Sequence, residues 1–436
     1  MRQKLLREGA NELSYEIRGI VRKAEQLEKL GYNILWENIG DPIQKNRKLP
    51  DWMKEIIAGL LFEDETFGYS HSKGVLETRQ FLAERNNKKG GAQITADDIT
   101  FFNGLGDAIA KIYQYLIPSA RVIGPSPAYS THSSAEASHA NNHPLTYKLD
   151  PENSWYPDLD DLYNKVKYNP NIVGILIINP DNPTGMVYPK PILERMVAIA
   201  QEFNLFLVCD EIYMNIIYNN ADTCSLAEVI GDVPGMSLKG ISKEFPWPGA
   251  RCGWAEYYNR DKDAEFARLC QTIDNAKMIE VSSTKLPQRA IPRIMSDSRY
   301  PDFIKATNKR IGERSAFLSK TFKDNPYITF NETNGAFYNT MIFKPDALKP
   351  GQSMPIKDAK VKQLLDSWFE SNNGPMEMDK RFVYYLLAAK QVCLVPISSF
   401  CSDLMGFRMT LLEENDEIRD EIFKRIKEGI EEFCRS

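Results

Sequence analysis

Short apolar runs separated by longer, more polar stretches recur along the chain from about residue 95 onward. The runs favour strand and predict strands at residues 99–102, 121–124, 172–178, 205–208 and 236–241. The stretches between some of them predict helices, for example at residues 191–203. Because the runs are continuously apolar rather than alternating, we expect strands buried on both faces, and hence a mostly parallel sheet. Ligands of such sheets gather at the carboxyl ends of the strands.

The pattern changes after about residue 300, where strands and helices are more widely mixed. Long amphipathic or charged helices are predicted at residues 302–323 and 416–433, and strands at 336–343, 392–395 and 407–411. The first forty residues are polar and predict a helical arm. We therefore expect an α/β fold with a large domain, whose mostly parallel sheet is sandwiched by helices, and a smaller α+β domain. The expected boundaries are 1–45 for the arm and part of the small domain, 46–310 for the large domain and 311–436 for the small domain.

Composition narrows the classes of protein that this chain can represent. Its 436 residues carry a net charge of -5 without a basic stripe, so we expect no nucleic-acid partner. The seven cysteines are scattered, which predicts reduced thiols and a cytoplasmic protein without a metal site. The charged first residues lack the apolar core of a signal peptide, and the most apolar run, 172–178, is too short to span a bilayer. We expect no membrane association.

The segment from Ser242 to Arg251 carries the most informative candidate chemistry. Lys243 lies in an apolar, aromatic setting, next to a hydroxyl and eight positions before a permanent cation. A nearby cation favours loss of the lysine proton, and an arginine can also fork onto phosphate oxygens. An amine nucleophile beside a phosphate site suits pyridoxal phosphate. A surface lysine followed by an ordinary salt-bridge arginine is the alternative.

Two other predicted strands end in residues that suit the same kind of ligand. Gly104, Leu105 and Gly106 follow the first strand and precede a helix, whose first N–H groups can hold a phosphate. Tyr129 follows the second strand on a proline-rich turn, where its ring can stack on a flat heteroaromatic ligand. An ordinary glycine turn and a packed tyrosine remain open as structural alternatives.

The next two strands end in amide and carboxylate side chains. The strand at 172–178 leads into a loop with two Asn-Pro steps and a glycine, a density that predicts a defined shape presenting Asn182. Asp210 ends a buried strand, where a carboxylate requires a cationic partner such as a protonated pyridine nitrogen. Metal binding by Asp210 and Glu211 is less favoured, because all four histidines lie far upstream.

Three motifs in order carry a resemblance to a known family. They read Asn179-Pro180-Asp181-Asn182-Pro183-Thr184-Gly185, then Asp210-Glu211-Ile212-Tyr213, then Ser242-Lys243 through Pro248-Gly249-Ala250-Arg251. Together they resemble the fold-type I pyridoxal-phosphate enzymes of the class I/II aminotransferase family. The likeness extends over almost the whole chain.

The resemblance implies a role for each matched position around the cofactor ring. Lys243 is similar to the lysine that forms the Schiff base, and Asp210 to the carboxylate that keeps the pyridine nitrogen protonated. Asn182 and Tyr213 match the pair that hydrogen-bonds the ring hydroxyl. Tyr129 resembles the aromatic residue that stacks on the ring.

The resemblance also implies a phosphate site and a homodimer. The residues that match the phosphate site are Ser242, Arg251 and the N–H groups of Leu105 and Gly106. Tyr69 resembles a tyrosine that reaches the phosphate held by a second subunit, which implies active sites at a subunit interface. Asp107 departs from the family pattern, because many relatives carry a small or hydroxylated residue there. It would oppose the phosphate, although the backbone donors should remain.

Arg408 and Gly40 are the matched residues on the substrate side. Arg408 resembles the arginine that forks the substrate α-carboxylate, with help from Asn182, and Gly40 matches a glycine in the loop that covers it. The activity implied is amino-group transfer between an α-amino acid and a 2-oxo acid, with Lys243 as general base and acid. Related enzymes on this fold are β-eliminating lyases, cyclopropane-forming synthases and β-decarboxylases, and these remain the alternative. A ligand-sensing module without turnover is a further alternative.

Overall fold

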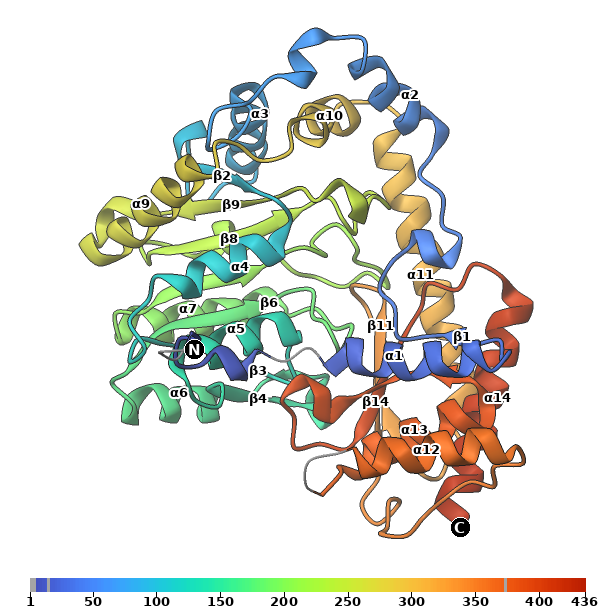
Figure 1. Cartoon of the computed structure of the whole chain (residues 1–436). Helices are drawn as coiled ribbons and strands as arrows, with labels where there is room; N and C mark the ends of the chain where they lie inside the picture. Colours follow the sequence, from blue (N-terminus) through green and yellow to red (C-terminus); the bar gives the residue numbers. More distant parts are fainter. Residues whose placement is uncertain (1–4, 14–15, 372–374) are drawn as a thin grey trace.

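The computed structural model describes residues 5–13, 16–371 and 375–436, and its largest element is an eight-stranded sheet (Figure 1). The strand order is β2-β9-β8-β7-β6-β3-β4-β5. In chain order the strands are β2 (Ile99–Phe102), β3 (Arg121–Ser126), β4 (Thr146–Asp150), β5 (Tyr156–Pro157), β6 (Ile172–Ile178), β7 (Phe206–Asp210), β8 (Gly235–Gly240) and β9 (Gly253–Tyr258). All five strands predicted for this region are present.

Most of this sheet is parallel, as the apolar pattern predicted. Strands β8, β7, β6, β3 and β4 pair in parallel. Strand β9 is antiparallel to both β2 and β8, so β2 and β8 run in the same direction on either side of it. The carboxyl ends of β2, β8, β7, β6 and β3 therefore share one edge of the sheet.

Helices cover both faces of the sheet, which explains the continuous apolarity of its strands. One face carries α4 (Leu105–Gln114), α5 (Ser130–Ala140) and α9 (Ala264–Ile279), and the other α6 (Leu159–Tyr168) and α7 (Lys190–Glu202). Successive residues of a strand point to opposite faces. In β6, Leu176 and Ile178 pack with the α4 and α9 side chains, whereas Ile175 and Ile177 pack with those of α6 and α7.

Three further helices pack around the β2 end of the sheet. They are α2 (Asp51–Leu60), α3 (Leu76–Asn87) and α10 (Lys285–Met295), while the short α8 (Leu226–Val229) contacts α7. None of the helices in the described part of the chain is both long and apolar enough for a membrane crossing.

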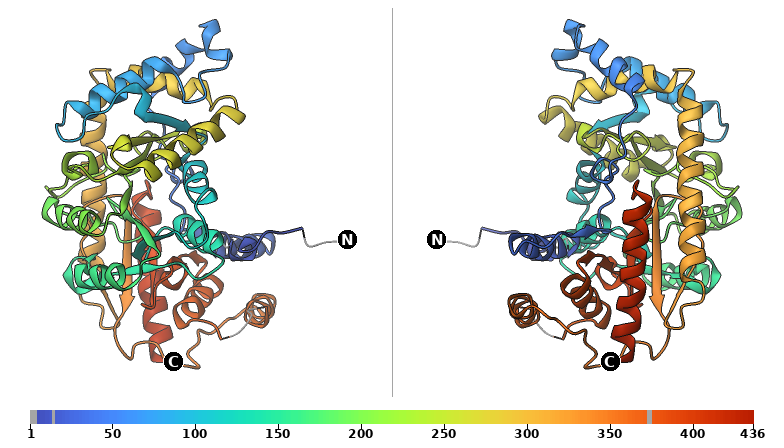
Figure 2. Two further views of the ribbon diagram at one scale, coloured as in Figure 1. Left: turned by 90° about the vertical axis from the view of Figure 1, so that its left-hand side faces the viewer. Right: turned by 90° about the vertical axis from the view of Figure 1, so that its right-hand side faces the viewer.

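A smaller α+β part follows, as predicted, and is built on a four-stranded antiparallel sheet in the order β10-β11-β14-β13. Its strands are β10 (Ile328–Phe330), β11 (Tyr338–Phe343), β13 (Val395–Pro396) and β14 (Gly406–Thr410). Its helices are α12 (Ala359–Glu370), α13 (Met378–Lys390) and α14 (Asp416–Arg435). Helix α11 (Tyr300–Phe322) runs along one side of both sheets (Figures 1 and 2). It contains the predicted boundary at 310/311, and the domain boundaries stay predictions.

The N-terminal region differs from the single helical arm that the sequence predicted. After a short 3-10 turn at Ala10–Glu12, α1 (Glu16–Lys29) is followed by a turn in which Gly31 has a φ of +91°, a left-handed conformation that favours glycine. The chain then becomes extended, and β1 (Leu35–Trp36) pairs with β12 (Val392–Cys393). Figure 2 shows α1 projecting from one side of the molecule.

A buried ion-pair cluster fixes the extended segment that follows β1. Lys45 Nζ lies 2.7 Å from Glu37 Oε1 and 3.2 Å from Glu413 Oε2. Thr410 Oγ1 on β14 donates to the other oxygen of Glu37 at 2.9 Å. These contacts hold residues 37–45 against the small sheet, which places Gly40 opposite the edge of the large one.

Candidate active site

A cavity of about 1100 Å³ lies at the carboxyl ends of the parallel strands, between the two sheets. The sequence-predicted residues that line it are Gly40, Leu105, Gly106, Tyr129, Asn182, Asp210, Tyr213, Ser242, Lys243, Arg251 and Arg408. Most of them follow directly on a strand of the large sheet, so the strand direction alone brings these distant segments together. Tyr69 does not line the cavity. Its side chain is 82% exposed, and its role toward a second subunit stays a prediction.

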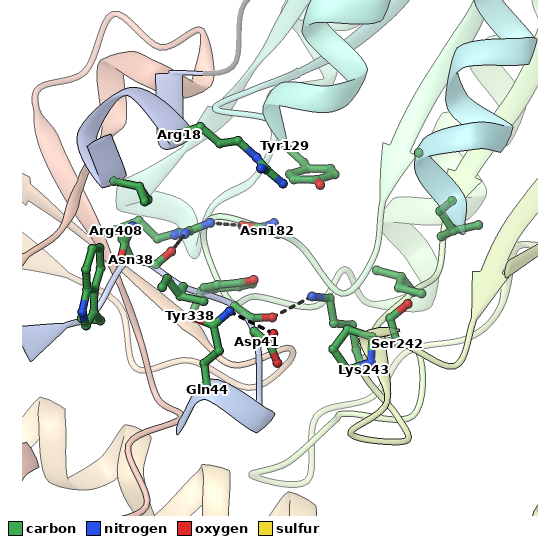
Figure 3. Close-up of a pocket in the computed structure, with 18 of the residues that line it drawn as sticks. Arg18, Asn38, Asp41, Gln44, Tyr129, Asn182, Ser242, Lys243, Tyr338 and Arg408 are labelled. Carbon is green, nitrogen blue, oxygen red and sulfur yellow. Dashed lines mark hydrogen bonds between the residues drawn. The ribbon is translucent and has the colours of Figure 1, made fainter. Parts of the chain in front are cut away.

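Lys243 lines the cavity with its amine close to the extended N-terminal segment. Its Nζ donates to the carbonyl oxygen of Gly40 at 2.7 Å (Figure 3). Burial lowers the pKa of this amine from 10.5 to about 8. The positive charges of Arg408 and Arg251 act in the same direction, and the carboxylate of Asp41 acts against it. Near neutral pH the uncharged, nucleophilic form is therefore much more populated for Lys243 than for an ordinary lysine.

Asp210 is held in a fixed orientation at the end of β7. Its Oδ2 lies 3.0 Å from Nε2 of His132, and its Oδ1 accepts from the N–H of Ile212 at 3.1 Å. Sequence reasoning set His132 aside as distant from Asp210. The available signal was its position one helical turn after Tyr129, at the start of α5.

Another part of the cavity, beside Arg251, is suited to bind an anion. Gly104, just before α4, has φ +87°, and a Cβ built on it would lie 2.4 Å from Nη2 of Arg251. The first residues of α4, Leu105 and Gly106, line the cavity beside Arg251 and Ser242. The helix N-terminus, the guanidinium and the hydroxyl together favour a phosphate.

Asp107 does not face that anion site as an unbalanced charge. Its carboxylate accepts from the N–H of Asn103 at 3.0 Å and pairs with Lys111 at 2.6 Å and Lys277 at 3.4 Å. The negative charge of Asp107 is thus balanced by one lysine of α4 and one of α9. The backbone N–H donors of Leu105 and Gly106 remain at the cavity.

The loop that presents Asn182 has the defined shape that its prolines predicted. Asp181 Oδ2 accepts from the N–H and the hydroxyl of Thr184 at 3.0 and 2.6 Å. Gly185 has φ +75°, and a Cβ there would lie 2.1 Å from the carbonyl oxygen of Tyr338. The loop therefore packs directly on the small sheet.

Arg408 joins the two halves of the cavity from β14. Its guanidinium donates to Asn182 Oδ1 at 3.1 Å and to the carbonyl oxygen of Asn38 at 2.5 Å (Figure 3). It also lies 4.3 Å from the centre of the Tyr338 ring. Arg408 is thus a buried cation whose position is set by both sheets and by the N-terminal segment.

Several cavity residues were missed from sequence. Tyr338 contacts Tyr213 through their hydroxyl oxygens at 3.2 Å, and the buried amide of Asn38 has no partner among the described residues. Arg18 and Arg22 enter from α1. Their spacing of four residues on an amphipathic helix was the available signal, but it is equally typical of a solvated face.

The class I and II aminotransferase family model matches residues 34–422, so the chain belongs to this family. Over its full length it is 54% identical to an uncharacterised aminotransferase of Methanocaldococcus jannaschii, and the match covers 100% of both proteins. It is 35% identical to the glutamate-pyruvate aminotransferase of Escherichia coli over 243 residues, which are 55% of this chain and 58% of that protein.

A solved structure shows the same fold. The alanine aminotransferase of Pyrococcus furiosus aligns with a TM-score of 0.84 at 26% identity, covering 98% of this chain and 100% of that one. Family and relatives identify the chain as an aminotransferase, an enzyme, and favour amino-group transfer over the lyase and decarboxylase alternatives.

The lowered pKa of Lys243 gives a first prediction. In protein without added cofactor, reductive methylation of Lys243 should reach its half-maximal rate near pH 8 instead of 10.5, because only the uncharged amine reacts. Peptide mass spectrometry across a pH series measures this. Asp41→Asn should lower the midpoint and Arg251→Gln should raise it, since these charges act in opposite directions. A midpoint near 10.5 would contradict the assignment.

Proposed function

We propose that the protein uses pyridoxal 5'-phosphate, held in the cavity by Lys243. One observation carries this proposal: an amine of lowered pKa lines the same cavity as an oriented carboxylate, Asp210, and a glycine-backed anion site at Arg251. This donor set fits an aldehyde-bearing pyridine phosphate, and family membership supports it. The Cβ clash at Gly104 further indicates that Arg251 needs open space there.

When bound, pyridoxal phosphate supplies a protonated ring that stabilises negative charge at the substrate Cα. Asp210, oriented by His132, holds the proton on the ring nitrogen, and Asn182 and Tyr213 hydrogen-bond the ring hydroxyl. Tyr129 stacks on the ring. Ser242, Arg251 and the N–H groups of Leu105 and Gly106 bind the phosphate.

On the substrate side of the cavity, a positioned cation again binds an anionic group. Arg408 binds the α-carboxylate with Asn182, under the segment that contains Gly40, and this orients the Cα–H bond. Lys243 Nζ would then take the proton from Cα as general base and deliver it, as general acid, to the aldehyde carbon of the cofactor. Its pKa of about 8 suits both directions near neutral pH.

The anion site gives a prediction with a matched control. Gly104→Ala should weaken the affinity of the protein for pyridoxal phosphate at least about tenfold, because the new Cβ displaces Arg251 from a charge-assisted contact. Gly249→Ala, in the short 3-10 turn just before Arg251, adds a Cβ that meets no atom within 4 Å, and this variant should bind normally. Equilibrium titration followed by visible absorbance measures both. Equal affinities would argue against the phosphate position.

We further propose that glutamate is one amino donor and alanine another, with their 2-oxo acids as acceptors. The names of the Escherichia coli and Pyrococcus furiosus proteins support this choice. Arg18 and Arg22 support it physically, because they line the cavity and neither has an ion-pair partner within the described residues. They offer a second cationic position, apart from Arg408, for a distal carboxylate.

A half-reaction screen over amino acids tests this substrate class. Arg18→Gln should lower kcat/KM for glutamate about tenfold to a hundredfold and leave alanine nearly unchanged, because only glutamate loses a hydrogen-bonded charge. Lys29→Gln, on the same helix but outside the cavity lining, is the control. Glu25 and Glu28 also line the cavity. A preference for lysine or ornithine over glutamate would therefore overturn the assignment.

We also propose that the enzyme is a homodimer whose partner contributes Tyr69 to the phosphate site. Exposed apolar side chains lie on the α2–α3 connection, which carries Tyr69, and at the end of α9. They include Phe62, Phe67, Met278 and Ile279, the last 86% exposed. Arg289 of α10 donates to the hydroxyl of Thr66 at 2.7 Å and so ties α10 to the α2–α3 connection. Exposed apolar surface of this kind is typical of subunit interfaces.

Sedimentation velocity tests the dimer. The wild-type protein should have about twice the chain mass of 49.8 kDa. Phe67→Asp should yield monomers with weakened cofactor affinity, whereas Tyr168→Asp, at a similarly exposed aromatic far from this surface, should stay dimeric. A wild-type monomer with full cofactor affinity would rule the shared site out.

Finally, we propose a cytoplasmic location. Five of the seven cysteines are buried free thiols, which suits a reducing compartment. Recovery of the native protein in a membrane or extracellular fraction after gentle lysis would contradict this.

A further inference from the structure

A second, much smaller cavity lies behind the lysine, on the far side of the segment that carries it. It has a volume of about 60 Å³ and shares no lining residue with the large cavity. Lys243 faces the large cavity, and the next residue, Glu244, faces the small one. The two side chains thus leave one short segment in different directions.

Glu244 is buried and connects two parts of the site. Its side chain is only 6% exposed, and Oε2 accepts from Nδ2 of Asn215 at 2.7 Å. Asn215 belongs to the turn that follows β7 and carries Tyr213. We call this hydrogen bond the Glu244–Asn215 brace. It is a direct side-chain link between the lysine segment and the tyrosine turn.

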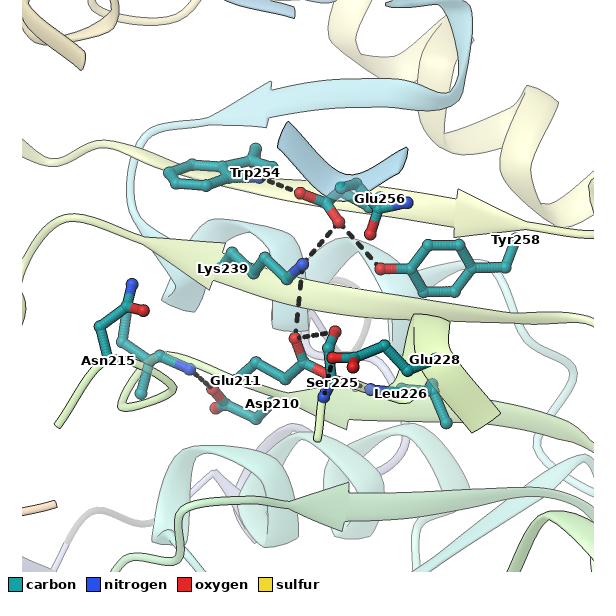
Figure 4. A network of polar contacts seen from close by, with 12 residues as sticks. Asp210, Glu211, Asn215, Ser225, Leu226, Glu228, Lys239, Trp254, Glu256 and Tyr258 are labelled. Carbon is teal, nitrogen blue, oxygen red and sulfur yellow. Dashed lines mark hydrogen bonds and ion pairs between the residues drawn. The ribbon is translucent and has the colours of Figure 1, made fainter. Parts of the chain in front are cut away.

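The other charged groups around the small cavity do not replace this link. Lys239 pairs with Glu256 at 2.6 Å and Glu211 at 3.4 Å (Figure 4). Glu211 also accepts from the N–H of Leu226 at 2.6 Å. Those groups satisfy one another, while Oε1 of Glu244 has no hydrogen-bond partner among the described residues.

We propose that the Glu244–Asn215 brace is a positioning device that keeps Lys243 and Tyr213 in register from behind the active site. In the proposed function, Lys243 and Tyr213 both contact the same cofactor. A displacement of either side chain by about 1 Å can lower the rate by orders of magnitude. Glu244 and Asn215 touch neither substrate nor cofactor, so both are positioning residues. The functional part of this inference rests on the roles proposed above for Lys243 and Tyr213.

Protonation of Glu244 tunes the strength of the brace. Burial raises the pKa of this carboxyl to about 7, against the hydrogen bond from Asn215 and the positive charges of Arg85, Lys89 and Lys239. Glu211 and Glu256 are the other charged groups that line the cavity. An ionised carboxylate accepts a stronger hydrogen bond than a neutral one. The brace is therefore strongest above pH 7 and weakens as the pH falls through it.

A double-mutant cycle tests the brace in the holoenzyme. Glu244→Ala and Asn215→Ala should each lower kcat about tenfold with little change in KM, and the double variant should be no worse than either. Glu244→Gln keeps an acceptor of the same size and should stay within about twofold of wild type. Effects that multiply in the double variant, or a Gln variant as slow as the Ala variant, would overturn the proposal.

Amide hydrogen exchange supplies a readout that does not depend on cofactor. Within the tyrosine turn, the N–H of Met214 donates to the backbone carbonyl oxygen of Glu211 at 2.9 Å, and the N–H of Ile216 donates to that of Tyr213 at 2.7 Å. In cofactor-free protein, Asn215→Ala should lower the protection of these two amides about tenfold. In wild type their protection should fall below pH 7 and in Glu244→Gln it should not.

The matched control is Asn331→Ala, which removes a half-buried amide that donates to Pro151 at 2.9 Å outside both cavities. It should leave kcat and the turn amides unchanged. Unchanged protection of the Met214 and Ile216 amides in Asn215→Ala would refute the brace. This test remains valid even if Glu244→Ala does not fold. If Asn215→Ala lowers the protection of the turn amides but the wild-type protein does not bind pyridoxal phosphate, the brace stands and the proposed function is contradicted.

Discussion

The common direction of five strands is the constraint on which the site depends. Strands β2, β8, β7, β6 and β3 all end at one edge, although β9 is inserted between two of them in the opposite direction. An aromatic ring, an amide, a carboxylate, an amine and a helix N-terminus are thereby delivered to one cavity by backbone pairing. Burial of both sheet faces keeps those strands in place. The same parallel pairing therefore builds the hydrophobic core and positions the side chains of the site.

The second half of the site comes from a region that the large sheet does not control. Asn38 and Gly40 reach the cavity because Lys45, Glu37 and Glu413 tie the N-terminal segment to the small sheet. Arg408 then bridges to the Asn182 loop. The proposed substrate-binding groups thus lie mostly on the small sheet and the N-terminal segment, and the proposed cofactor-binding groups mostly on the large sheet. Such a division allows substrate preference to change while the cofactor site stays the same.

The parts of this structure that sequence could predict are those fixed by local pattern. Strands with two apolar faces and the motifs at their ends were readable because each is contiguous in the chain. Strand β9 was not, because its apolar run is interrupted by Glu256, a buried carboxylate whose partner Lys239 lies on the neighbouring strand. Asn38 and Tyr338 belong to the site through tertiary contacts, and His132 through its contact with Asp210, to which its position after Tyr129 was the only sequence pointer. Arg18 has the sequence context of an ordinary surface charge.

The hydrogen bond from Lys243 to Gly40 has a further thermodynamic meaning. The same amine cannot remain a donor to that carbonyl and also form a covalent bond to an aldehyde in the same orientation. Occupancy of the lysine and this one hydrogen bond are therefore linked equilibria, and each opposes the other. The Gly40 carbonyl competes for the amine while the Lys45 ion pairs keep the segment in place.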